Sequence, residues 1–294
     1  MKLKKLAALL MAALTVMSLA ACTTEESGAP ADDKPSQSQG QGGTDKTGDK
    51  TDGQDGDKEP AEKKTLIVGT SADFAPYEFH KMVDGEDKIL GFDIALAQKI
   101  ADEMGAELEI KDMDFNSLLI ELQSGKLDLV AAALSPDPER AKQVDFSEPY
   151  YFGNQCCIIR KEDEGKYQSV EDFDGVPVAA QVGSIQEGLV KDLFTGATMV
   201  SLAKLPDEIL SLSSGKVDGV VVETAVANGF IAQNPNLMIG FDVPYEAKGS
   251  CLAVQKGDTE LLEHVNSVIA DVTSSGEMDE MVAQANIDAE GAEE

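Results

Sequence analysis

The hydrophobic pattern of the chain alternates between short apolar runs and longer segments with a helical period. Residues 65–70 (TLIVGT) have the length of a buried strand. Residues 93–104 repeat apolar positions every three to four residues, with Asp93 as the expected N-cap and Gly105 as the stop. Further apolar runs predict strands at 108–111, 127–133, 156–160, 176–182 and 252–254. Further helical periods predict helices at 225–232, 261–273 and 277–282. This alternation is typical of an α/β fold.

Two segments of the chain repeat each other without a gap. Residues 116–135 (NSLLIELQSGKLDLVAAALS) align with residues 206–225 (PDEILSLSSGKVDGVVVETA). Each copy predicts an amphipathic helix, a glycine stop in the left-handed backbone conformation, and an apolar strand. A match over a whole helix and strand favours two related α/β units over a chance repetition of a common helix–turn–strand sequence.

Polar residues follow the strand in each copy of the repeat. The first strand stops at the proline-rich run 135–138, and Arg140 comes directly after it. Its guanidinium can bind a carboxylate in bidentate fashion, although a surface ion pair with a neighbouring acid is the alternative. In the second copy, Glu223 aligns with Ala133 at the strand end. Ligands of open α/β sheets bind at such ends. Facing strand ends would therefore offer Arg140 to the carboxylate of a zwitterion and Glu223 to its ammonium.

The N-terminal segment has the pattern of a lipoprotein signal peptide. Three lysines precede the apolar residues 6–19, which are too few for a comfortable membrane span. The run Leu-Ala-Ala-Cys at 19–22 looks like a lipoprotein signal-peptidase site. We therefore predict that residues 1–21 are a signal peptide and that Cys22 carries the lipid, with a plain secretory signal and a free Cys22 as the alternative. Two acyl chains suffice for stable anchoring to the outer face of the cell membrane.

The segment that follows, residues 22–62, is rich in small and polar residues and almost free of apolar ones. We expect a disordered tether, because such a composition cannot bury enough apolar surface to fold. About 40 flexible residues span roughly 35 Å root-mean-square. The whole chain of 294 residues has 54 acidic and 24 basic side chains and a formal net charge of −30. This charge argues against nucleic acid as a partner, because it would repel phosphates.

Several motifs of the chain resemble those of bacterial extracellular solute-binding proteins of the polar amino acid type (family 3), the substrate-binding lipoproteins of amino acid ABC transporters. They are GTSADFAPYEF (69–79), GFDIALA (91–97), LLIELQSGKLD (118–128), SPDPER with VDFSEPYY (135–140, 144–151), GSIQE (183–187) and VDGVVVE (217–223). Their order and spacing match the family from about residue 65 to residue 282.

The resemblance implies a periplasmic-binding-protein-like (type II) α/β fold, with two lobes, a strand hinge and a ligand cleft between the lobes. It places lobe I at 63–155 plus 249–288 and lobe II at 156–248, followed by a frayed tail at 289–294. It implies a protein, expected to be a monomer, that captures a polar L-amino acid, with basic amino acids among the candidates, and delivers it to the membrane subunits of an ABC permease.

The same resemblance assigns residues to the carboxylate and ammonium of the amino acid ligand. Arg140 would bind the carboxylate together with the amides of Ser135 and Ile185. The carboxylate of Glu223, the carbonyl of Ala133 and the hydroxyl of Ser135 would bind the ammonium. This is the polarity that the internal repeat also predicts.

A second group of residues is expected around the ligand side chain. The resemblance assigns three of them: Phe74, Phe115 and Gln181. Ser71 stands where members of the family often carry an acid that contacts the side chain, and this departure leaves a basic ligand open. Asp73 and Glu78 are the acids that could replace it, or they could cap the loop.

The remaining reactive side chains carry weaker signals. Cys156, Cys157 and Cys251 lie on stretches expected near the hinge, and we favour reduced thiols over a disulfide. His80 and His264 show no metal-ligand spacing, and we expect both at the surface. We therefore predict no cofactor, no metal and no catalytic residue.

Two other functions remain open at this point. A ligand-sensing module for a membrane receptor would also suit a tethered binding protein. The same fold hosts cyclohexadienyl and arogenate dehydratases, in which Arg140 would hold a carboxylate and Glu223 or Asp73 would act as a general acid. The expected lipid anchor favours transport over the enzyme.

Overall fold

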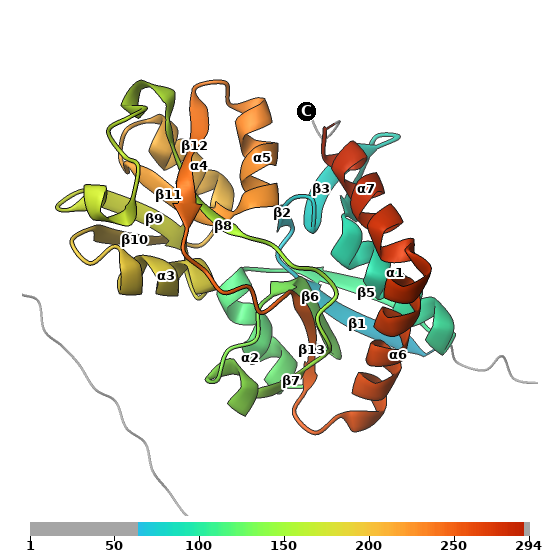
Figure 1. Cartoon of the computed structure of the whole chain (residues 1–294). Coiled ribbons are helices and arrows are strands. Elements are labelled where there is room, and N and C mark those ends of the chain that lie inside the picture. Colours follow the sequence, from blue (N-terminus) through green and yellow to red (C-terminus); the bar gives the residue numbers. More distant parts are fainter. Residues whose placement is uncertain (1–63, 291–294) are drawn as a thin grey trace, which may run out of the picture. The chain divides into compact units, whose positions relative to one another are not determined.

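The computed structural model describes residues 64–290, which form two five-stranded sheets with helices on their faces (Figure 1). We call each sheet and its helices a lobe. The predicted signal peptide, the lipid site Cys22 and the predicted tether lie outside the described residues. The two-lobed α/β prediction is confirmed.

The sheet of lobe I has the order β5-β1-β6-β13-β7. Its strands are β1 (Thr65–Thr70), β5 (Glu107–Asp112), β6 (Leu129–Leu134), β7 (Val144–Phe146) and β13 (Cys251–Gln255). Strand β1 pairs in parallel with β5 and β6, whereas β13 is antiparallel to β6 and β7. Its helices are α1 (Phe92–Met104), α2 (Leu118–Gln123), α6 (Thr259–Ser275), α7 (Glu277–Glu290) and the 3-10 turns η1 (Phe115–Ser117) and η2 (Arg140–Lys142). A small sheet beside them contains β2 (Asp73–Phe74), β3 (Glu78–Val83) and β4 (Glu86–Leu90).

The sheet of lobe II has the order β10-β9-β11-β8-β12. Its strands are β8 (Gln155–Arg160), β9 (Pro177–Gln181), β10 (Thr198–Leu202), β11 (Gly219–Glu223) and β12 (Leu237–Val243). Its helices are α3 (Ile185–Leu193), α4 (Leu205–Ser213), α5 (Thr224–Gln233) and the 3-10 turns η3 (Lys161–Asp163) and η4 (Val170–Phe173). Strand β9 is parallel to β10 and β11, and β8 is antiparallel to β11.

The internal repeat corresponds to one helix–turn–strand unit in each lobe. Helix α2 leads through Gly125 into β6, and helix α4 leads through Gly215 into β11. The two glycines have φ angles of 77° and 73°, in the left-handed region that a side chain disfavours. Both strands are the central strand of their sheet. The repeat therefore builds the middle of each lobe and brings both strand ends to the junction.

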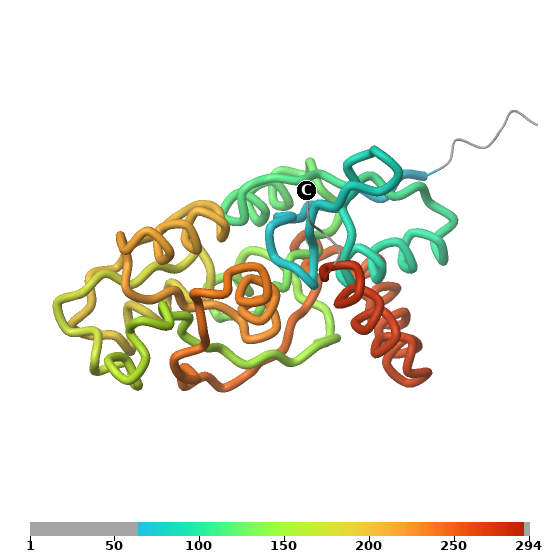
Figure 2. Tube along the Cα trace, turned by 90° about the horizontal axis from the view of Figure 1, so that it is seen from above, coloured from blue at the N-terminus to red at the C-terminus, as the bar shows by residue number. Residues whose placement is uncertain are grey.

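The C-terminal part of the chain returns to lobe I. Strand β13 inserts between β6 and β7, and α1, α6 and α7 pack against one another. Seen from above, the red C-terminal helices lie beside the blue N-terminal strands (Figure 2). Helix α1 buries Ile94, Ala97, Ile100 and Ala101 on one face and ends at Gly105, as the helical period predicts.

The expected capping role of Asp93 is wrong. Gly91 occupies the N-cap position of α1, and Asp93 lies inside the first turn with no exposed surface. Its carboxylate instead accepts hydrogen bonds from the amide of Ala133 and the hydroxyl of Tyr150. Tertiary partners from β6 and from the segment after β7 outweigh the local cap, because both donors would otherwise be buried without an acceptor.

Two chain segments cross between the lobes, residues 147–154 and residues 244–250. They run alongside each other, since Tyr150 donates its amide to the carbonyl of Ser250 and Ser250 donates to that of Tyr151, at 2.9 and 2.7 Å. The connection is thus a short two-stranded hinge. The three cysteines beside it, Cys156, Cys157 and Cys251, are buried and free.

Candidate functional site

A cavity lies at the junction of the two lobes. All nine residues predicted for the ligand site line it: Asp73, Phe74, Phe115, Ala133, Ser135, Arg140, Gln181, Ile185 and Glu223. The first six come from lobe I and the last three from lobe II. The two strand ends of the repeat therefore face the same cavity.

Arg140 is held in place by groups from both lobes. Its Nη1 donates to the carbonyl of Ser135 and its Nη2 to that of Gly183, both at 2.8 Å, and its Nε lies 3.1 Å from a carboxylate oxygen of Asp137. The guanidinium also stands 5.6 Å from the ring centre of Phe115, within range of a cation–π contact. The ion pair with an adjacent acid, which the sequence left as an alternative, exists. It orients a guanidinium that still lines the cavity.

The backbone of Ala133, near the end of β6, has an unusual conformation. Its φ of 48° is unusual for a residue with a side chain. The ladder between β6 and β13 shifts its register between Cys251 and Ala253, so the backbone here leaves the regular pairing. The amide of Ala133 is anchored on Asp93 Oδ2 at 2.9 Å. Strain of this kind persists only where the surroundings enforce it, and it is concentrated at binding sites.

Glu223 divides its carboxylate between a helix and the cavity. Oε2 accepts the amides of Ala225 and Val226 at 3.0 and 3.3 Å and so caps α5. Oε1 approaches Gly153 of the hinge so closely that a Cβ added there would lie 2.2 Å from it. Burial raises the pKa of Glu223 to about 7, although the amides of helix α5 lower it. This carboxylate is thus poised to change protonation near neutral pH.

A buried acid pair lies at another part of the lining. Glu78 is 1% exposed, and its Oε2 has no hydrogen-bond partner. Burial, followed by the charge of Asp93, raises the pKa of Glu78 well above its usual range. Burial also raises the pKa of Asp93 to about 7. Two carboxyl groups this close and this dry favour a shared proton until a cation reaches them.

Three glutamines and a tyrosine add to the polar lining from lobe II and the hinge. Gln181 donates to the carbonyl of Ala203 at 3.1 Å, Gln186 donates to the Gln155 side chain at 2.9 Å, and Tyr245 lies 3.4 Å from the Ser135 hydroxyl. The sequence missed Gln155, Gln186 and Tyr245 as lining residues. Gln186 lies inside the GSIQE motif, which was the one available signal.

Neither histidine lines the cavity. His80 is half exposed and lies between the carboxylates of Asp87 and Asp112, and His264 is half buried against the carbonyl of Ile100. Within residues 64–290, no three His, Cys, Asp or Glu side chains are grouped to hold a metal ion. None of the helices in that range is long and apolar enough to cross a membrane.

A polar cavity between two lobes, joined by two crossing segments, defines a binding protein that closes around a small ligand. The chain belongs to the bacterial extracellular solute-binding proteins, family 3, which it matches over residues 66–285. Proteins of this class serve as the substrate-binding components of amino acid ABC transporters, outside the cytoplasm.

Relatives of the chain are also amino-acid-binding proteins. The chain is 39% identical to the arginine-binding extracellular protein ArtP of Bacillus subtilis, over 74% of this chain and 85% of that protein. It is 29% identical to a probable histidine-binding protein of Campylobacter jejuni, over 76% and 86% of the two chains. Among solved structures, it is similar to the amino acid ABC transporter substrate-binding protein AbpA of Streptococcus pneumoniae bound to L-arginine. That likeness has a TM-score of 0.75 and 41% identity and covers 78% and 97% of the two chains.

Proposed function

We propose that this protein binds a basic L-amino acid, with L-arginine as the foremost candidate, and delivers it to an ABC importer. The observation that carries the proposal is the charge of the cavity lining. Besides Asp73, whose carboxylate oxygens contact Leu205 and Ser71, the lining contains two carboxyl groups, those of Glu78 and Glu223, and one guanidinium, that of Arg140. An amino acid backbone brings one negative and one positive charge, so it leaves an excess of acid that a cationic side chain would neutralise.

The carboxylate and the ammonium of the ligand would each bind protein groups of opposite charge. Its carboxylate would lie against the guanidinium of Arg140, with the amides of Ser135 and Ile185 as further donors. Its ammonium would bind the Oε1 of Glu223, the oxygen that does not cap α5. The carbonyl of Ala133 and the hydroxyl of Ser135 complete this group. Charge-assisted hydrogen bonds of this kind are about twice as strong as neutral ones.

The side chain of the ligand would extend toward Glu78. Its Oε2 is buried without a partner, and leaving a buried polar group unpaired costs roughly 1–3 kcal/mol. A guanidinium or ammonium would supply the missing donor and favour the ionised carboxylate. The aromatic rings of Phe74 and Phe115 would flank the apolar stem of the side chain. This arrangement would let Glu78 take over the role that an acid at Ser71 has elsewhere in the family.

The printed names of the relatives support the same ligand class. ArtP is an arginine-binding protein, and AbpA was solved with L-arginine. Family membership favours transport over the sensor and the dehydratase.

The deciding experiment compares L-arginine with L-citrulline by isothermal titration calorimetry. Citrulline has the same shape and a neutral ureido group in place of the guanidinium. We expect L-arginine to bind at least about 100-fold more tightly, because a neutral group leaves the buried carboxyl without a cation. Equal affinities would contradict a basic ligand. In Glu78→Gln the arginine preference should shrink roughly tenfold or more, since the negative partner is lost. The control Glu109→Gln removes an exposed lobe I acid that pairs with Lys111, and it should keep the preference.

We further propose that lipid on Cys22 anchors this protein, as a monomer on a tether of residues 22–62, to the outer face of the cell membrane. The support is the signal-peptidase site at 19–22 and the polar composition that follows it. Cys22→Ser should move the protein from the membrane fraction to the medium or periplasm. Unchanged membrane association of this variant would contradict the lipid anchor.

A further inference from the structure

The two lobes also touch outside the part of the cavity that faces Arg140 and Glu223. Strand β2 of lobe I faces the beginning of α4 in lobe II, and the amide of Leu205 donates to Asp73 Oδ2 at 3.2 Å. Residues 73 and 205 are far apart in sequence and lie on opposite sides of the lobe junction. This hydrogen bond therefore joins the lobes.

Helix α4 has no cap from its own lobe. Its N-cap residue is Lys204, which makes no side-chain capping hydrogen bond. The first amides of a helix lack partners inside the helix, and a carboxylate there is favoured by both hydrogen bonding and the helix dipole. Asp73 supplies this carboxylate from the other lobe. The start of α4 is thus capped across the junction.

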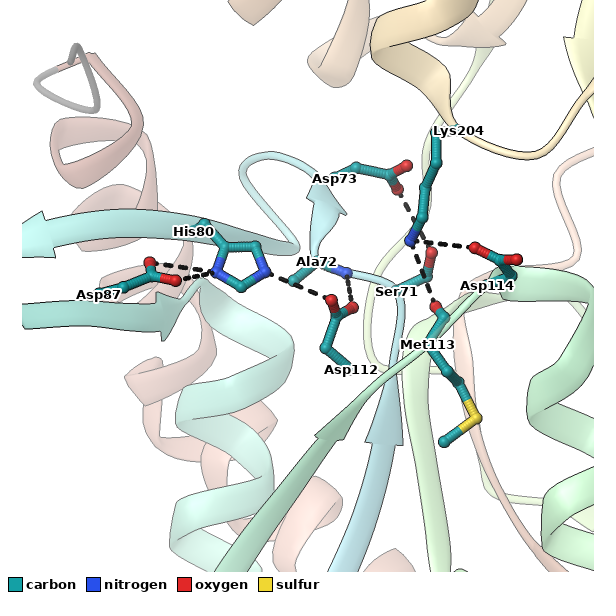
Figure 3. A network of polar contacts seen from close by, with 9 residues as sticks. All are labelled: Ser71, Ala72, Asp73, His80, Asp87, Asp112, Met113, Asp114 and Lys204. Atoms are coloured by element: carbon teal, nitrogen blue, oxygen red, sulfur yellow. Dashed lines mark hydrogen bonds and ion pairs between the residues drawn. The ribbon is translucent and has the colours of Figure 1, made fainter.

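Lys204 makes the reciprocal contact. Its Nζ lies 3.6 Å from Asp114 Oδ1 and 3.5 Å from the carbonyl oxygen of Met113, both in lobe I (Figure 3). The side chains of Lys204 and Asp114 are 33% and 52% exposed, so this pair is weakened by solvent and salt. Asp73 and Lys204 therefore connect the lobes in opposite directions, an acid of lobe I to a helix of lobe II and a base of lobe II to lobe I.

Each oxygen of the Asp73 carboxylate contacts one protein group. Oδ2 accepts from Leu205, and Oδ1 lies 3.4 Å from the Ser71 hydroxyl (Figure 3). The neighbouring amide of Ala72 is fixed on Asp112 Oδ1 at 2.9 Å, so the loop that carries Asp73 is braced. Burial raises the pKa of Asp73, and the charge of Lys204 opposes that rise. Although Asp73 lines the cavity, its two oxygens face α4 and Ser71.

We propose that Asp73 and Lys204 form an interlobe clasp that holds the closed state and sets the rate of ligand release. Asp73 is then a closing residue, and the selection of the ligand side chain belongs to Glu78. The inference rests on the proposed function, since closure around an amino acid is what the clasp would secure. Contacts that exist only between closed lobes stabilise that state alone, so they slow dissociation more than they change association.

The kinetic test measures L-arginine and L-citrulline binding by stopped flow in wild type, Asp73→Ala and Lys204→Met. Alanine removes the acceptor of the Leu205 amide, which asparagine would keep. We expect the dissociation rate of L-arginine to rise roughly 3- to 30-fold in Asp73→Ala, the range for a lost helix cap. In Lys204→Met it should rise roughly two- to fivefold, as for a partly exposed ion pair. Association rates should stay within about twofold. The arginine-to-citrulline affinity ratio should be unchanged in both variants.

The control is Lys191→Met, because Lys191 is an exposed lysine of lobe II that pairs with Glu187 of its own lobe. It should release L-arginine at the wild-type rate. Unchanged dissociation in Asp73→Ala, or an affinity ratio that falls as it does in Glu78→Gln, would overturn the clasp. The second outcome would place Asp73 on the ligand side chain.

A measurement without ligand kinetics separates the clasp from the ligand assignment. Spin labels on Lys126→Cys and Lys216→Cys, in a full chain with Cys22→Ser, report the distance between the two repeat turns, one in each lobe. Asp73→Ala should shift the distribution toward longer, open distances, with or without L-arginine. If L-arginine fails to bind wild type, the proposed ligand is wrong, and the clasp is judged by this shift alone. Identical distributions in wild type and Asp73→Ala would overturn it.

Discussion

In the proposed complex, Glu223 couples the binding of the ligand to the loss of a proton. Its pKa is about 7 in the structure because it is buried, whereas a ligand ammonium requires the ionised carboxylate. Below pH 7 the carboxylate is increasingly protonated, and the ligand must displace that proton. Above pH 7 the ionised form is already present and the proton no longer competes.

We therefore predict that the affinity for L-arginine falls as the pH is lowered from 8 to 5.5. Glu223 contributes at most about tenfold per pH unit below 7 to the rise in the dissociation constant, because it loses one proton and one pKa unit corresponds to 1.36 kcal/mol. The proton shared by Glu78 and Asp93 adds a second contribution. Titration calorimetry in buffers of different ionisation enthalpy would show proton release on binding at pH 6.5. Glu223→Gln should bind weakly with a flatter profile. A wild-type affinity that is constant over this range would contradict the assignment of Glu223.

Position 153 has no room for a side chain, because Glu223 Oε1 lies close to the backbone of Gly153. We predict that Gly153→Ala leaves the protein folded but weakens L-arginine binding roughly tenfold or more, since the added methyl displaces a charged partner of the ligand. Calorimetry checks the affinity and circular dichroism the fold. The matched control is Gly188→Ala in α3, where a Cβ would meet nothing within 4 Å. That variant should keep its affinity. Equal effects of the two substitutions would argue against a specific role of Gly153.

At the scale of elements, the helix–turn–strand unit occurs twice and uses the same backbone device. Gly125 and Gly215 both have a positive φ, and no atom lies within 4 Å of a Cβ added at either position. Conformational strain is therefore the only cost of a side chain there. Arg160 braces the second unit, because it donates to the carbonyls of Leu212 and Val217 and to the carboxylate of Asp218.

We predict that Gly125→Ala and Gly215→Ala destabilise the protein by similar amounts, roughly 1–2 kcal/mol each. Urea unfolding followed by circular dichroism measures the change in the free energy of unfolding. Gly188→Ala, at an ordinary helical position, serves as the reference and should be neutral or stabilising by up to about 1 kcal/mol. A clear loss in one lobe and none in the other would contradict equivalent turns.

Element prediction succeeded for several strands but missed β10 and β12, although β12 is a largely apolar run. The runs at 65–70, 108–111 and 156–160 correspond to β1, β5 and β8 within about two residues at each end. The hairpin of β3 and β4 was missed, because its polar residues show little alternation. Asp93 was misassigned for a different reason: capping propensity is local, while its partners Ala133 and Tyr150 come from distant segments.

At the scale of the whole molecule, the net charge of −30 should act on the approach of a cationic ligand. Long-range attraction increases association rates and is screened when the Debye length shrinks. We predict that the association rate of L-arginine falls a few-fold between about 20 mM and about 500 mM salt, whereas that of L-citrulline changes little. Stopped-flow measurements check both. A parallel decrease for the two ligands would contradict electrostatic steering.

The sequence by itself determined the class of fold, the internal repeat and nine of the residues that line the cavity. Periodicity, turn glycines and the paired Arg140 and Glu223 are local signals, and they survive in any structure that buries the apolar runs. Only the tertiary structure decided how those residues share their atoms. It showed that Glu223 caps α5 with one oxygen and turns the other toward Gly153 of the hinge, that Glu78 is buried beside Asp93, and that Asp73 faces α4 of the other lobe. Apart from the local cap of α5, these relations depend on contacts between segments distant in sequence, and burial and pairing are set by such contacts.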